Sequence, residues 1–566
     1  MGSTSSDDRV DVVVIGSGFG GSVAAHRLAE AGLEVCILER GRAYPPGSFP
    51  RDPAGVARNF WDPSKGHHGM FNVWSFSGID AVVSSGLGGG SLIYANVLLR
   101  KDERWFVDEQ PFGGGYERWP IGRADLEPHY DRVEPMLQAQ HYPYPDTTPK
   151  TVAMRHAADV LGHEWQLPPL AVTFANPGRT AAPGEPIVDR PYPNLHGLPR
   201  RTCILCGECD IGCNEGAKET LDHNYLSAAA AAGADIRIRH EVRALTKVGD
   251  EWEVDYIVHE ADDGEAIDTA RLPVRSIRAR RVVVAAGALG STFLLLRNRA
   301  GLPWLSPTIG TRFSGNGDLL GFLLRARHGD GSARALDGTR GPVITSAIRF
   351  PDGLDTDGPG DDATRGFYVE DAGYPAFLAW LAETTQFHRG IGRQARVAWR
   401  RVWARLRRDH RSNWSADLAE AIGSGELSAS SLPLLGMGRD VPDGTLRLEG
   451  RWLANDWSMD SSKEYFDAVR AAMEAMAAAL GGEMAPNPLA FLKRVVTVHP
   501  LGGAPMAATP ELGVVDPHGA VFGCEGLHVL DGAVMPGPTG PNPALTIAAF
   551  ADRGAEHILE LEGLTT

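Results

Sequence analysis

The 566-residue chain has no excess of positive charge and no long apolar run. It holds 55 Lys and Arg residues against 71 Asp and Glu residues, a formal net charge of −16. Nucleic acid is therefore not expected as a partner, because phosphates bind basic surfaces. No apolar run approaches the roughly 20 residues that a membrane-spanning helix needs. These absences favour a soluble globular protein.

The first residues also lack the features of a secretory signal peptide. They are polar and acidic, without a basic start or an apolar stretch, and a strand is expected from Val10. This predicts a cytoplasmic protein. Cysteine is scarce as well, and two of the six, Cys36 and Cys524, lie far apart in apolar surroundings. In a reducing compartment we expect both to be buried thiols without a partner.

The length and composition set the scale of the fold. A chain of this length is too long for one compact core, so two or more domains are expected. Hydrophobic residues at 43% and charged residues at 22% are ordinary for a globular protein. The 67 glycines and 39 prolines predict many tight turns and places where the backbone approaches a ligand closely.

The N-terminal segment has the pattern of a βαβ unit. Val10–Ile15 is continuously apolar, as in a parallel strand buried on both faces, and Leu33–Leu38 is expected to be the second strand. Glu39 ends that strand, where an acid commonly bonds the ribose hydroxyls of an adenine nucleotide.

A G-x-G-x-x-G motif fills the turn between the first strand and the helix. Gly16 permits the turn, Gly18 lets the backbone approach a pyrophosphate, and Gly21 lets helix and strand pack closely. The strand, helix, second strand and acid around the motif indicate a dinucleotide site. The motif alone does not separate FAD from NAD.

Two further segments have small residues next to apolar runs. In residues 84–99, Gly88–Gly90 leave backbone N–H groups free to face an anion or a flat ring. In residues 278–298, the strand Val282–Val284 is followed by small residues at 285–290 and then by a helix. This second segment is expected to return to the same sheet after a long insertion.

The C-terminal part contains two more candidate site segments. Residues 498–506 read VHPLGGAPM, and residues 527–558 combine a strand, Asp531, a Gly/Pro loop and a helix from about Pro543. Asn542 directly precedes that helix, where its side chain could cap the helix or point into a site.

The predicted fold class is α/β. It combines a doubly wound, discontinuous, Rossmann-like domain with a substrate domain whose antiparallel β-sheet is covered by helices. Residues 341–350, 365–371 and 444–457 are expected to supply strands of that sheet, and residues 461–482 a helix. We assign the nucleotide domain to residues 8–44, 78–130, 205–310 and 498–566, and the substrate domain to residues 45–77, 131–204 and 311–497.

The order of these motifs resembles the glucose–methanol–choline (GMC) family of FAD-dependent oxidoreductases. Within it the chain is most similar to the cholesterol oxidase branch, in particular its actinobacterial members. The resemblance covers nearly the whole chain. It is carried by VVVIGSGFGGSVAAHRLAEAG, GLGGGSLIYAN, CGECDIGCNEGAKETLDHNYL, FSGNGDLL, VTVHPLGGAPM and DGAVMPGPTGPNPALTIAAFADR.

The resemblance implies FAD as cofactor and a lipophilic secondary alcohol as substrate, most specifically a 3β-hydroxysteroid such as cholesterol. It implies that His499 handles the hydroxyl proton and that Asn542 positions substrate and flavin. Alcohol oxidation removes a hydride, which flavin N5 accepts, and a proton, which suits a group that titrates near neutrality. Molecular oxygen or another acceptor then takes the electrons. The implied cofactor-binding residues are Gly16, Gly18, Phe19, Gly20, Gly21, Glu39, Gly88, Gly89, Gly90, Ser91, Asn96, Ala286, Gly287, Asp531, Gly532, Asn542 and Pro543.

The chain departs from the cholesterol oxidase pattern at two places. An asparagine soon after the GGGS motif is replaced by Tyr94, and the nearest asparagine is Asn96. The glutamate that shifts the steroid double bond in that branch has Glu426 as its candidate here, on a loose alignment, so isomerase activity is not predicted. His67 and His68 are expected to be exposed loop residues rather than ligands.

Four cysteines occur in one run, C-x2-C-x2-C-x3-C, formed by Cys203, Cys206, Cys209 and Cys213. This spacing is found in bacterial ferredoxins, where a second set of cysteines completes the fold, and no second set is present here. Three interpretations remain open: an iron–sulfur cluster that carries electrons away from the flavin, a structural zinc, or thiols that only shape a loop. In each case the cysteines are accessory to the bond that the enzyme breaks.

Residues 387–414 form a basic segment in an otherwise acidic chain. Apolar residues at helical spacing, including Trp399 and Trp403, share one face, and seven arginines lie opposite. Such a helix suits peripheral contact with an anionic membrane at its inner face. A surface helix packed on its own domain is the alternative.

The sequence leaves more than one function open. The leading prediction is FAD-dependent oxidation of a lipophilic secondary alcohol. One alternative is a dehydrogenase of another lipophilic or long-chain alcohol that uses an acceptor other than oxygen. A second is a membrane-associated flavin protein that transfers electrons or acts as a scaffold. Because the family also includes lyases and a decarboxylase, fold alone does not prove oxidation.

Overall fold

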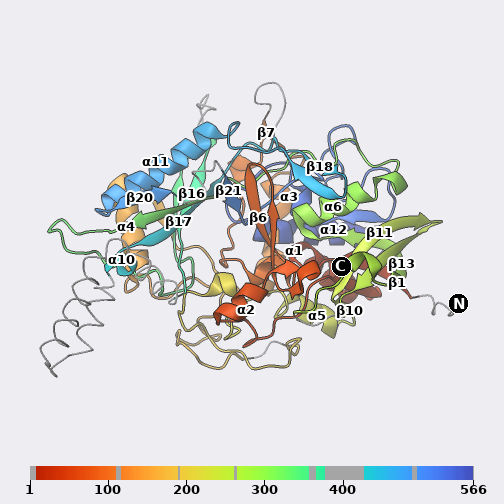
Figure 1. Cartoon of the computed structure of the whole chain (residues 1–566), viewed down its shortest axis with the longest axis horizontal. Coiled ribbons are helices and arrows are strands. Elements are labelled where there is room, and N and C mark those ends of the chain that lie inside the picture. The colour runs from red at the N-terminus through yellow and green to blue at the C-terminus, as the bar shows by residue number, and fades with distance from the viewer. Residues whose placement is uncertain are drawn as a thin grey trace, which may run out of the picture.

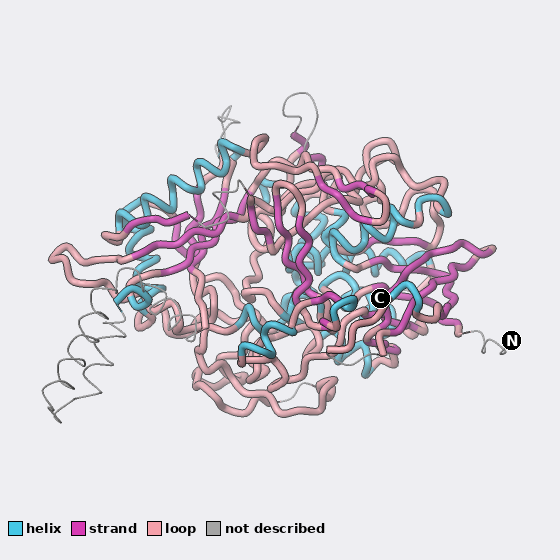
Figure 2. Tube along the Cα trace, viewed as in Figure 1, coloured by secondary structure: helices cyan, strands magenta, loops and turns pink. Residues whose placement is uncertain are grey.

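The computed structural model describes residues 8–109, 117–188, 191–260, 264–355, 365–375, 426–486 and 494–564. Figure 1 shows one large sheet that contains β1 (Arg9–Ile15) and a second sheet, covered by α11 (Lys463–Ala479), at the far end of the molecule. Figure 2 shows that much of the remaining chain runs as loops. The basic segment 387–414 lies outside the described residues, so its predicted helix is not tested. No helix among the described residues is long and apolar enough to cross a membrane.

The first sheet has seven strands and contains the predicted βαβ unit. In the dinucleotide-binding part of the sheet, neighbouring strands run parallel. Beyond β13 (Arg275–Val284), neighbouring strands run antiparallel. The last three residues of β13 pair in parallel with β22, a strand from the C-terminal part of the chain. The strand order is β10 (Asp235–Ile238), β2 (Val35–Glu39), β1 (Arg9–Ile15), β13 (Arg275–Val284), β12 (Glu251–Val258) and β11 (His240–Val248), with β22 (Leu527–Val529) beside β13.

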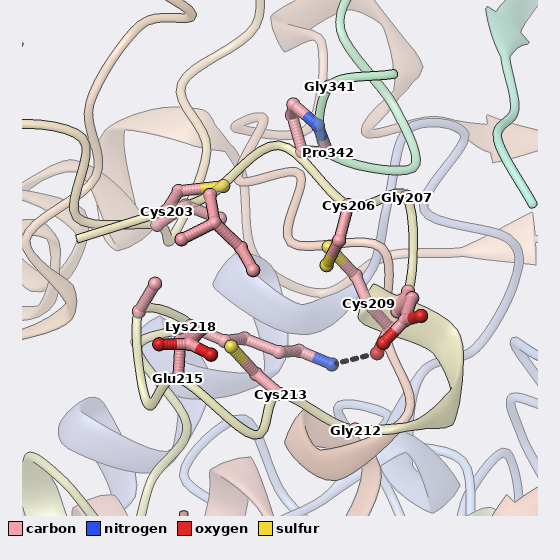
Figure 3. Close-up of a pocket in the computed structure, with 14 residues that line it drawn as sticks. Cys203, Cys206, Gly207, Cys209, Gly212, Cys213, Glu215, Lys218, Gly341 and Pro342 are labelled. Atoms are coloured by element: carbon pink, nitrogen blue, oxygen red, sulfur yellow. Dashed lines mark hydrogen bonds between the residues drawn. The ribbon is translucent and has the colours of Figure 1, made fainter. Parts of the chain in front are cut away.

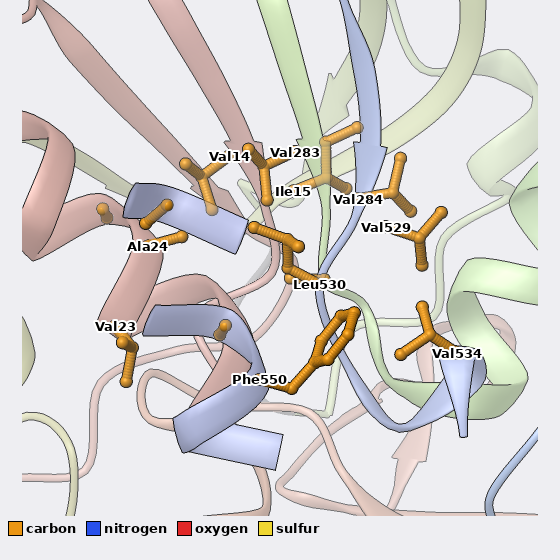
Figure 4. Packing of buried hydrophobic residues seen from close by; sticks show 14 of the residues in the cluster. Val14, Ile15, Val23, Ala24, Val283, Val284, Val529, Leu530, Val534 and Phe550 are labelled. Carbon is orange, nitrogen blue, oxygen red and sulfur yellow. The ribbon is translucent and has the colours of Figure 1, made fainter. Parts of the chain in front are cut away.

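Apolar side chains from segments far apart in the sequence bury this sheet under its helices. Figure 4 shows Val14 and Val283 from neighbouring strands close to Leu530, and the ring of Phe550 against Leu530. All four are buried. The N-terminal and C-terminal segments therefore share one core, as the discontinuous fold requires. The helices around it are α1 (Phe19–Glu30), α3 (Arg123–Leu137), α5 (Tyr225–Ala231), α6 (Gly287–Arg297) and α12 (Ala544–Leu561).

The second sheet has six strands, and all of its neighbouring strands are antiparallel. Helices α4 (Pro149–Leu161) and α11 (Lys463–Ala479) pack against it and bury its apolar face. This confirms the predicted antiparallel sheet covered by helices. The strand order is β20 (Glu483–Pro486), β14 (Leu319–Leu324), β17 (Leu432–Gly438), β16 (Phe367–Asp371), β15 (Ala347–Phe350) and β9 (Glu164–Gln166).

Two predictions made from the sequence about local structure are wrong. The segment 444–457 forms a separate hairpin, β18 (Leu446–Glu449) with β19 (Trp452–Asn455), and does not join the six-stranded sheet. The pair of histidines forms β4 (His67–His68), which pairs with β3 (Trp61–Asp62), and His68 is buried. Strand periodicity does not identify the partner of a strand, and this explains the first error.

The remaining elements are short. A three-stranded sheet joins β5 (Phe71–Ser75), β6 (Ile79–Ser84) and β21 (Val495–Thr497). Strands β6 and β21 fall on opposite sides of the domain boundary drawn from the sequence, and that division remains a prediction. The others are α2 (Pro53–Arg58), β7 (Asp108–Glu109), β8 (Glu117–Arg118) and α10 (Glu426–Ala429).

Candidate functional site

The G-x-G-x-x-G turn lies where the carboxyl ends of β1 and β13 meet. Gly16 has φ +96°, and a Cβ there would lie 2.4 Å from the carbonyl oxygen of Ala285. A Cβ on Gly21 would lie 2.1 Å from the carbonyl oxygen of Gly16. Only glycine fits at either position, so the motif is fixed by the packing of this turn. Ligands of open α/β sheets bind at this edge.

The carboxylate of Glu39 is buried at the end of β2, next to the same turn. Its Oε2 atom accepts hydrogen bonds from the Ser17 amide at 3.1 Å and the Ser17 hydroxyl at 2.6 Å. Its Oε1 atom accepts one from the Gly41 amide at 2.8 Å. These bonds hold the acid in the position that the sequence pattern assigns to a contact with the ribose.

The second glycine-rich segment lies directly on the first. The Gly88 amide donates to the Ser17 hydroxyl at 3.0 Å, and a Cβ on Gly89 would lie 2.7 Å from the Cα of Gly18. The Ser91 hydroxyl closes the turn by donating to the Gly88 carbonyl at 2.7 Å. The structure thus brings together two predicted cofactor segments that are about seventy residues apart in the chain.

A third predicted segment meets the site through Asp531. Its carboxylate accepts from the Gly287 amide at 2.8 Å, the Ser291 hydroxyl at 2.5 Å and the Ala533 amide at 2.8 Å. Burial raises the pKa of Asp531 to about 6. The acid therefore joins the start of α6 to the segment after β22.

The residues fit a bound dinucleotide. At Gly18, Gly90 and Gly287 an added Cβ would meet no atom within 4 Å, although other glycines of the same turns are tightly enclosed. These three positions therefore border open space at the edge of the sheet, and a backbone without side chains can approach a pyrophosphate there. The predicted FAD-binding segments converge on this open space beside Gly18, Gly90 and Gly287, which we call the cofactor cradle.

His499 projects beside a buried carboxylate. Its Nδ1 atom lies 2.9 Å from Oδ1 of Asp318. The other carboxylate oxygen accepts from the Thr497 hydroxyl at 2.9 Å and from the Val498 amide at 2.8 Å. Because Nδ1 donates to the carboxylate, Nε2 of a neutral imidazole is left as a proton acceptor. Asp318 lies in the FSGNGDLL segment and received no role from the sequence.

Asn542 is buried and points toward a second acid. Its side chain makes no capping bond to α12; instead Nδ2 lies 3.4 Å from Oε2 of Glu370 on β16. Burial raises the pKa of Glu370 to about 8, and Asp371 adds to the shift. The sequence suggested Glu426 as the functional glutamate, yet the glutamate beside Asn542 is Glu370. An acid within the apolar run of this strand was the signal that could have identified it.

One loop holds the His499 and Asn542 segments together. The Asn316 amide oxygen accepts from the backbone N–H groups of Thr539 at 2.9 Å and Gly540 at 3.2 Å, just before Asn542. Asp318, two residues further on, holds His499. The charge of Asp318 also contributes to the raised pKa of Glu370, which places the two acids near each other.

The histidine segment is also bonded to the cofactor segment. The Gly502 amide donates to the Gly532 carbonyl at 2.9 Å, and Ala504 donates to Ala533 at 2.9 Å. His499 therefore lies at the same sheet edge as the Asp531 turn. The predicted catalytic and cofactor-binding residues form a connected site, although their individual roles remain proposals.

The two residues that depart from the cholesterol oxidase pattern lie behind the glycine-rich segment. The Tyr94 ring packs edge-on against Phe19 with 5.5 Å between centroids, and its hydroxyl donates to the Glu219 carbonyl at 3.1 Å. Asn96 is buried with φ +73°, and its amide lies beside the Cys209 thiol. Neither polar atom of that amide has a hydrogen-bond partner among the described residues.

The cysteine run forms a pocket close to this point. Figure 3 shows Cys203, Cys206 and Cys213 around one space, with the Lys218 side chain running beside Cys213 toward Cys209. All six cysteines of the chain are free thiols in the structure. Cys36 and Cys524 are buried away from the run, as predicted.

The chain is similar over nearly its whole length to known flavoenzymes. Residues 437–551 match the family described as GMC oxidoreductase, and residues 11–44 match the FAD binding domain. A cholesterol oxidase of Mycobacterium tuberculosis strain H37Rv is 30% identical over 571 residues, which cover 96% of this chain and 90% of that protein. A cholesterol oxidase of Acinetobacter baumannii is 29% identical over 586 residues, covering 98% and 96%.

Solved structures share the fold at lower identity. The crystal structure of pyridoxine 4-oxidase from Mesorbium loti has a TM-score of 0.58 at 17% identity and covers 97% of this chain and 99% of that chain. A fungal aryl-alcohol oxidase has a TM-score of 0.56 at 16% identity, with coverage of 99% and 100%. At this identity the likeness concerns the fold alone.

The sheet edge, its glycine cradle and these matches define a FAD-dependent oxidoreductase that acts on CH–OH groups. The predicted cofactor, FAD, is confirmed. With a relative 30% identical across 96% of its length, the chain belongs to the GMC oxidoreductase family. This confirms the family expected from the motifs.

Proposed function

We propose that the chain oxidises the secondary alcohol of a lipophilic substrate, most specifically a 3β-hydroxysteroid such as cholesterol. Two relatives similar over nearly the whole chain are named cholesterol oxidases, and this supports the steroid. FAD, when bound, accepts the hydride of the alcohol carbon. The observation that carries the proposal is the pairing of His499 with the buried acid Asp318 at the edge of the cofactor cradle.

His499 acts as the proton acceptor in this proposal. The Asp318 carboxylate fixes the ring through Nδ1 and stabilises the positive charge that forms when Nε2 takes a proton. The imidazole is not fully buried, since 15% of its side-chain surface is exposed. It can therefore reach a substrate hydroxyl and return the proton to solvent.

Asn542 orients the substrate and the flavin in this proposal. One side of its amide faces Glu370, while its Oδ1 atom has no hydrogen-bond partner among the described residues. A buried, unpaired amide oxygen favours a donor such as a substrate hydroxyl. Because the pKa of Glu370 is about 8, its carboxyl group is mostly protonated at neutral pH and adds no negative charge beside the hydride acceptor.

A second activity on steroids is favoured by the position of Glu370. The buried carboxyl lies next to Asn542, and a carboxyl with a pKa of about 8 can exchange protons near neutrality. It is therefore a better candidate than Glu426 for moving a proton between steroid carbons. Product analysis tests this: wild type should yield a 4-en-3-one from cholesterol, whereas Glu370→Gln should accumulate the 5-en-3-one.

An anaerobic titration of the FAD-loaded protein with cholesterol tests the main proposal. Bleaching of the flavin band supports steroid oxidation. Rapid recovery of the band in air then indicates an oxidase, and slow recovery indicates a dehydrogenase that needs another acceptor. Absence of bleaching with cholesterol, but bleaching with other lipophilic alcohols, would rule out the steroid and favour the first alternative.

The scaffold alternative is opposed by the intact pair of His499 and Asp318. If the chain only carries flavin, His499→Gln should leave every redox property unchanged. The inner-face membrane contact of residues 387–414 remains a separate proposal. Flotation with anionic liposomes tests it, with uncharged liposomes and an arginine-to-glutamine variant of this segment as controls.

A further inference from the structure

The cysteine run curls around a single pocket next to the cofactor site. Three residues in the run have left-handed backbone conformations: Leu205 at φ +62°, Gly207 at φ +69° and Gly212 at φ +89°. These turns reverse the chain repeatedly over a few residues, so side chains separated in sequence face one space. The pocket is lined by Cys203, Cys206, Cys209 and Cys213 together with Val172, Ala217, Lys218 and Pro342.

Contacts from outside the run hold this conformation. The Arg51 guanidinium donates to the carbonyl oxygens of Ile211 at 3.2 Å and Gly212 at 2.6 Å, and pairs with Glu208 at 2.6 Å. The Gly207 amide donates to the Gly341 carbonyl at 2.9 Å. The run is therefore held in a defined conformation by the rest of the fold.

One of the sulfur atoms accepts a hydrogen bond from a backbone N–H group. The Leu205 amide donates to Cys203 Sγ at 3.4 Å. Such N–H groups stabilise negative charge on sulfur, and they tune the reduction potential of cysteine-ligated clusters.

The spacing of the sulfur atoms separates a cluster from a single ion. Zinc with four thiolates at about 2.3 Å brings its sulfur atoms to roughly 3.8 Å from one another. Among the described residues, only His196, Asp222 and His223 bring three potential ligand atoms within 4.8 Å of one another. No three sulfur atoms of the run are that close. The sulfur atoms as they stand therefore do not close on a single zinc ion, which favours a larger, multi-iron group.

The run is directly connected to the flavin-binding loop. Lys218 is buried, and its ammonium donates to the Leu92 carbonyl at 3.0 Å and the Cys209 carbonyl at 2.9 Å. Leu92 ends the GGGS turn that packs on Gly18. The same ammonium lies 4.7 Å from the centroid of the Tyr94 ring, and that ring contacts Phe19. Lys218 thus links the cysteine pocket to the loop of the cofactor cradle.

We propose that Cys203, Cys206, Cys209 and Cys213 ligate an iron–sulfur cluster that exchanges electrons with FAD. Reduced flavin loses two electrons and two protons; the cluster accepts the electrons one at a time, reducing one ferric iron to ferrous iron in each step. The protons pass to solvent. An external one-electron acceptor, for which ferricyanide serves in the assay, reoxidises the cluster. The four thiols that line one pocket held by the fold carry this proposal independently of the identity of the alcohol.

Metal analysis of the full-length protein, purified without oxygen, tests the proposal. We expect about four iron atoms and about four acid-labile sulfides per chain, and an electron paramagnetic resonance signal after reduction with dithionite. One zinc per chain without sulfide would overturn the cluster, as would four thiols that titrate with no metal bound. Neither result would affect the proposed alcohol oxidation, which is read from flavin bleaching.

Cysteine-to-serine variants provide a second test of the proposed cluster. Cys206→Ser and Cys213→Ser should lower iron and sulfide at least tenfold, whereas Cys524→Ser, a matched control outside the run, should leave both at the wild-type level. Because loss of the run could unfold the loop, the FAD content and the rate of flavin bleaching by substrate are measured on the same samples. Both should stay within a factor of two, while ferricyanide reduction falls. Wild-type metal content in both variants would contradict the assignment.

Discussion

The Nδ1 atom of His499 lies 2.9 Å from a carboxylate oxygen of Asp318, and this one contact decides which ring nitrogen can accept a proton. Asp318 comes from the loop before β14, whereas His499 follows β21, so the pair depends on long-range packing. Its position beside the Asp531 turn makes it the centre of the proposed chemistry.

Replacing His499 tests the proton acceptor. His499→Gln should lower kcat by about 10²- to 10⁴-fold, the usual contribution of a positioned acid–base group. FAD content should not change, because the imidazole does not hold the cofactor segments together. The measurement is steady-state turnover with the flavin spectrum of each sample. His156→Gln, at an exposed position on α4, is the control and should retain full activity.

Replacing Asp318 tests the positioning of the ring. Asp318→Asn keeps one oxygen for the Val498 amide but removes the charge that holds the imidazole. We expect kcat to fall by about 10- to 100-fold with little change in KM. Asp318→Glu should recover part of the loss. Asp330→Asn in an exposed loop serves as the control, and equal turnover in the two asparagine variants would argue against the pairing.

Filling the open cradle should remove the cofactor without unfolding the chain. Gly18 has an ordinary backbone conformation, with φ −70°, and an added Cβ meets nothing within 4 Å. Gly18→Val should therefore fold but weaken FAD binding by at least about tenfold, or roughly 1.4 kcal/mol. Absorbance of the purified protein and titration with FAD measure the effect. Gly329→Val, at a similarly open position on an exposed loop, should stay fully loaded.

Glu370 predicts a dependence of stability on pH. In the folded protein burial raises the pKa of Glu370 from 4.5 to about 8. The unfolded chain therefore loses this proton first, so stability is greatest below about pH 4.5 and falls until about pH 8. Glu370→Gln removes this contribution. The difference in Tm between variant and wild type should shift in favour of the variant as the pH rises from about 5 to 8, and parallel curves would contradict the raised pKa.

The core beneath the cofactor sheet can be tested separately from the chemistry. Phe550 on α12 is fully buried, and its ring lies against Leu530 (Figure 4). Phe550→Ala should destabilise the fold by about 3–5 kcal/mol, because a cavity remains where the ring was. Urea unfolding monitored by circular dichroism measures the loss. Leu561→Ala, on the exposed end of the same helix, should change stability by no more than about 0.5 kcal/mol.

The cofactor segments could be predicted because their signals are local. A strand, a glycine turn and a helix lie within a few dozen residues, and the conformation of Gly16 follows from the turn itself. The acid at Glu39 and the small residues before α6 are found in the same way. For this reason the sequence could predict the strands, the turn and the helix at this edge, whereas the contacts of single residues with FAD remain predictions.

The partners of His499 and Asn542 could not be predicted, because they depend on pairing between distant strands. Glu370 faces Asn542 only because β16 takes one register between β15 and β17. A shift of one residue would turn this acid to the other face of the sheet. The same limit explains why Asp318 received no role and why the segment 444–457 was placed in the wrong sheet.

The parallel pairing of β13 with β22 has a consequence for biosynthesis. β1 ends at residue 15, whereas β22 begins at residue 527, so the sheet edge that carries Asp531 is translated long after the glycine turn it completes. Chains begin to fold from the N-terminus as they are made. The nascent first half must therefore wait on the ribosome with an unfinished sheet, and flavin can be captured securely only after the last part of the fold has emerged.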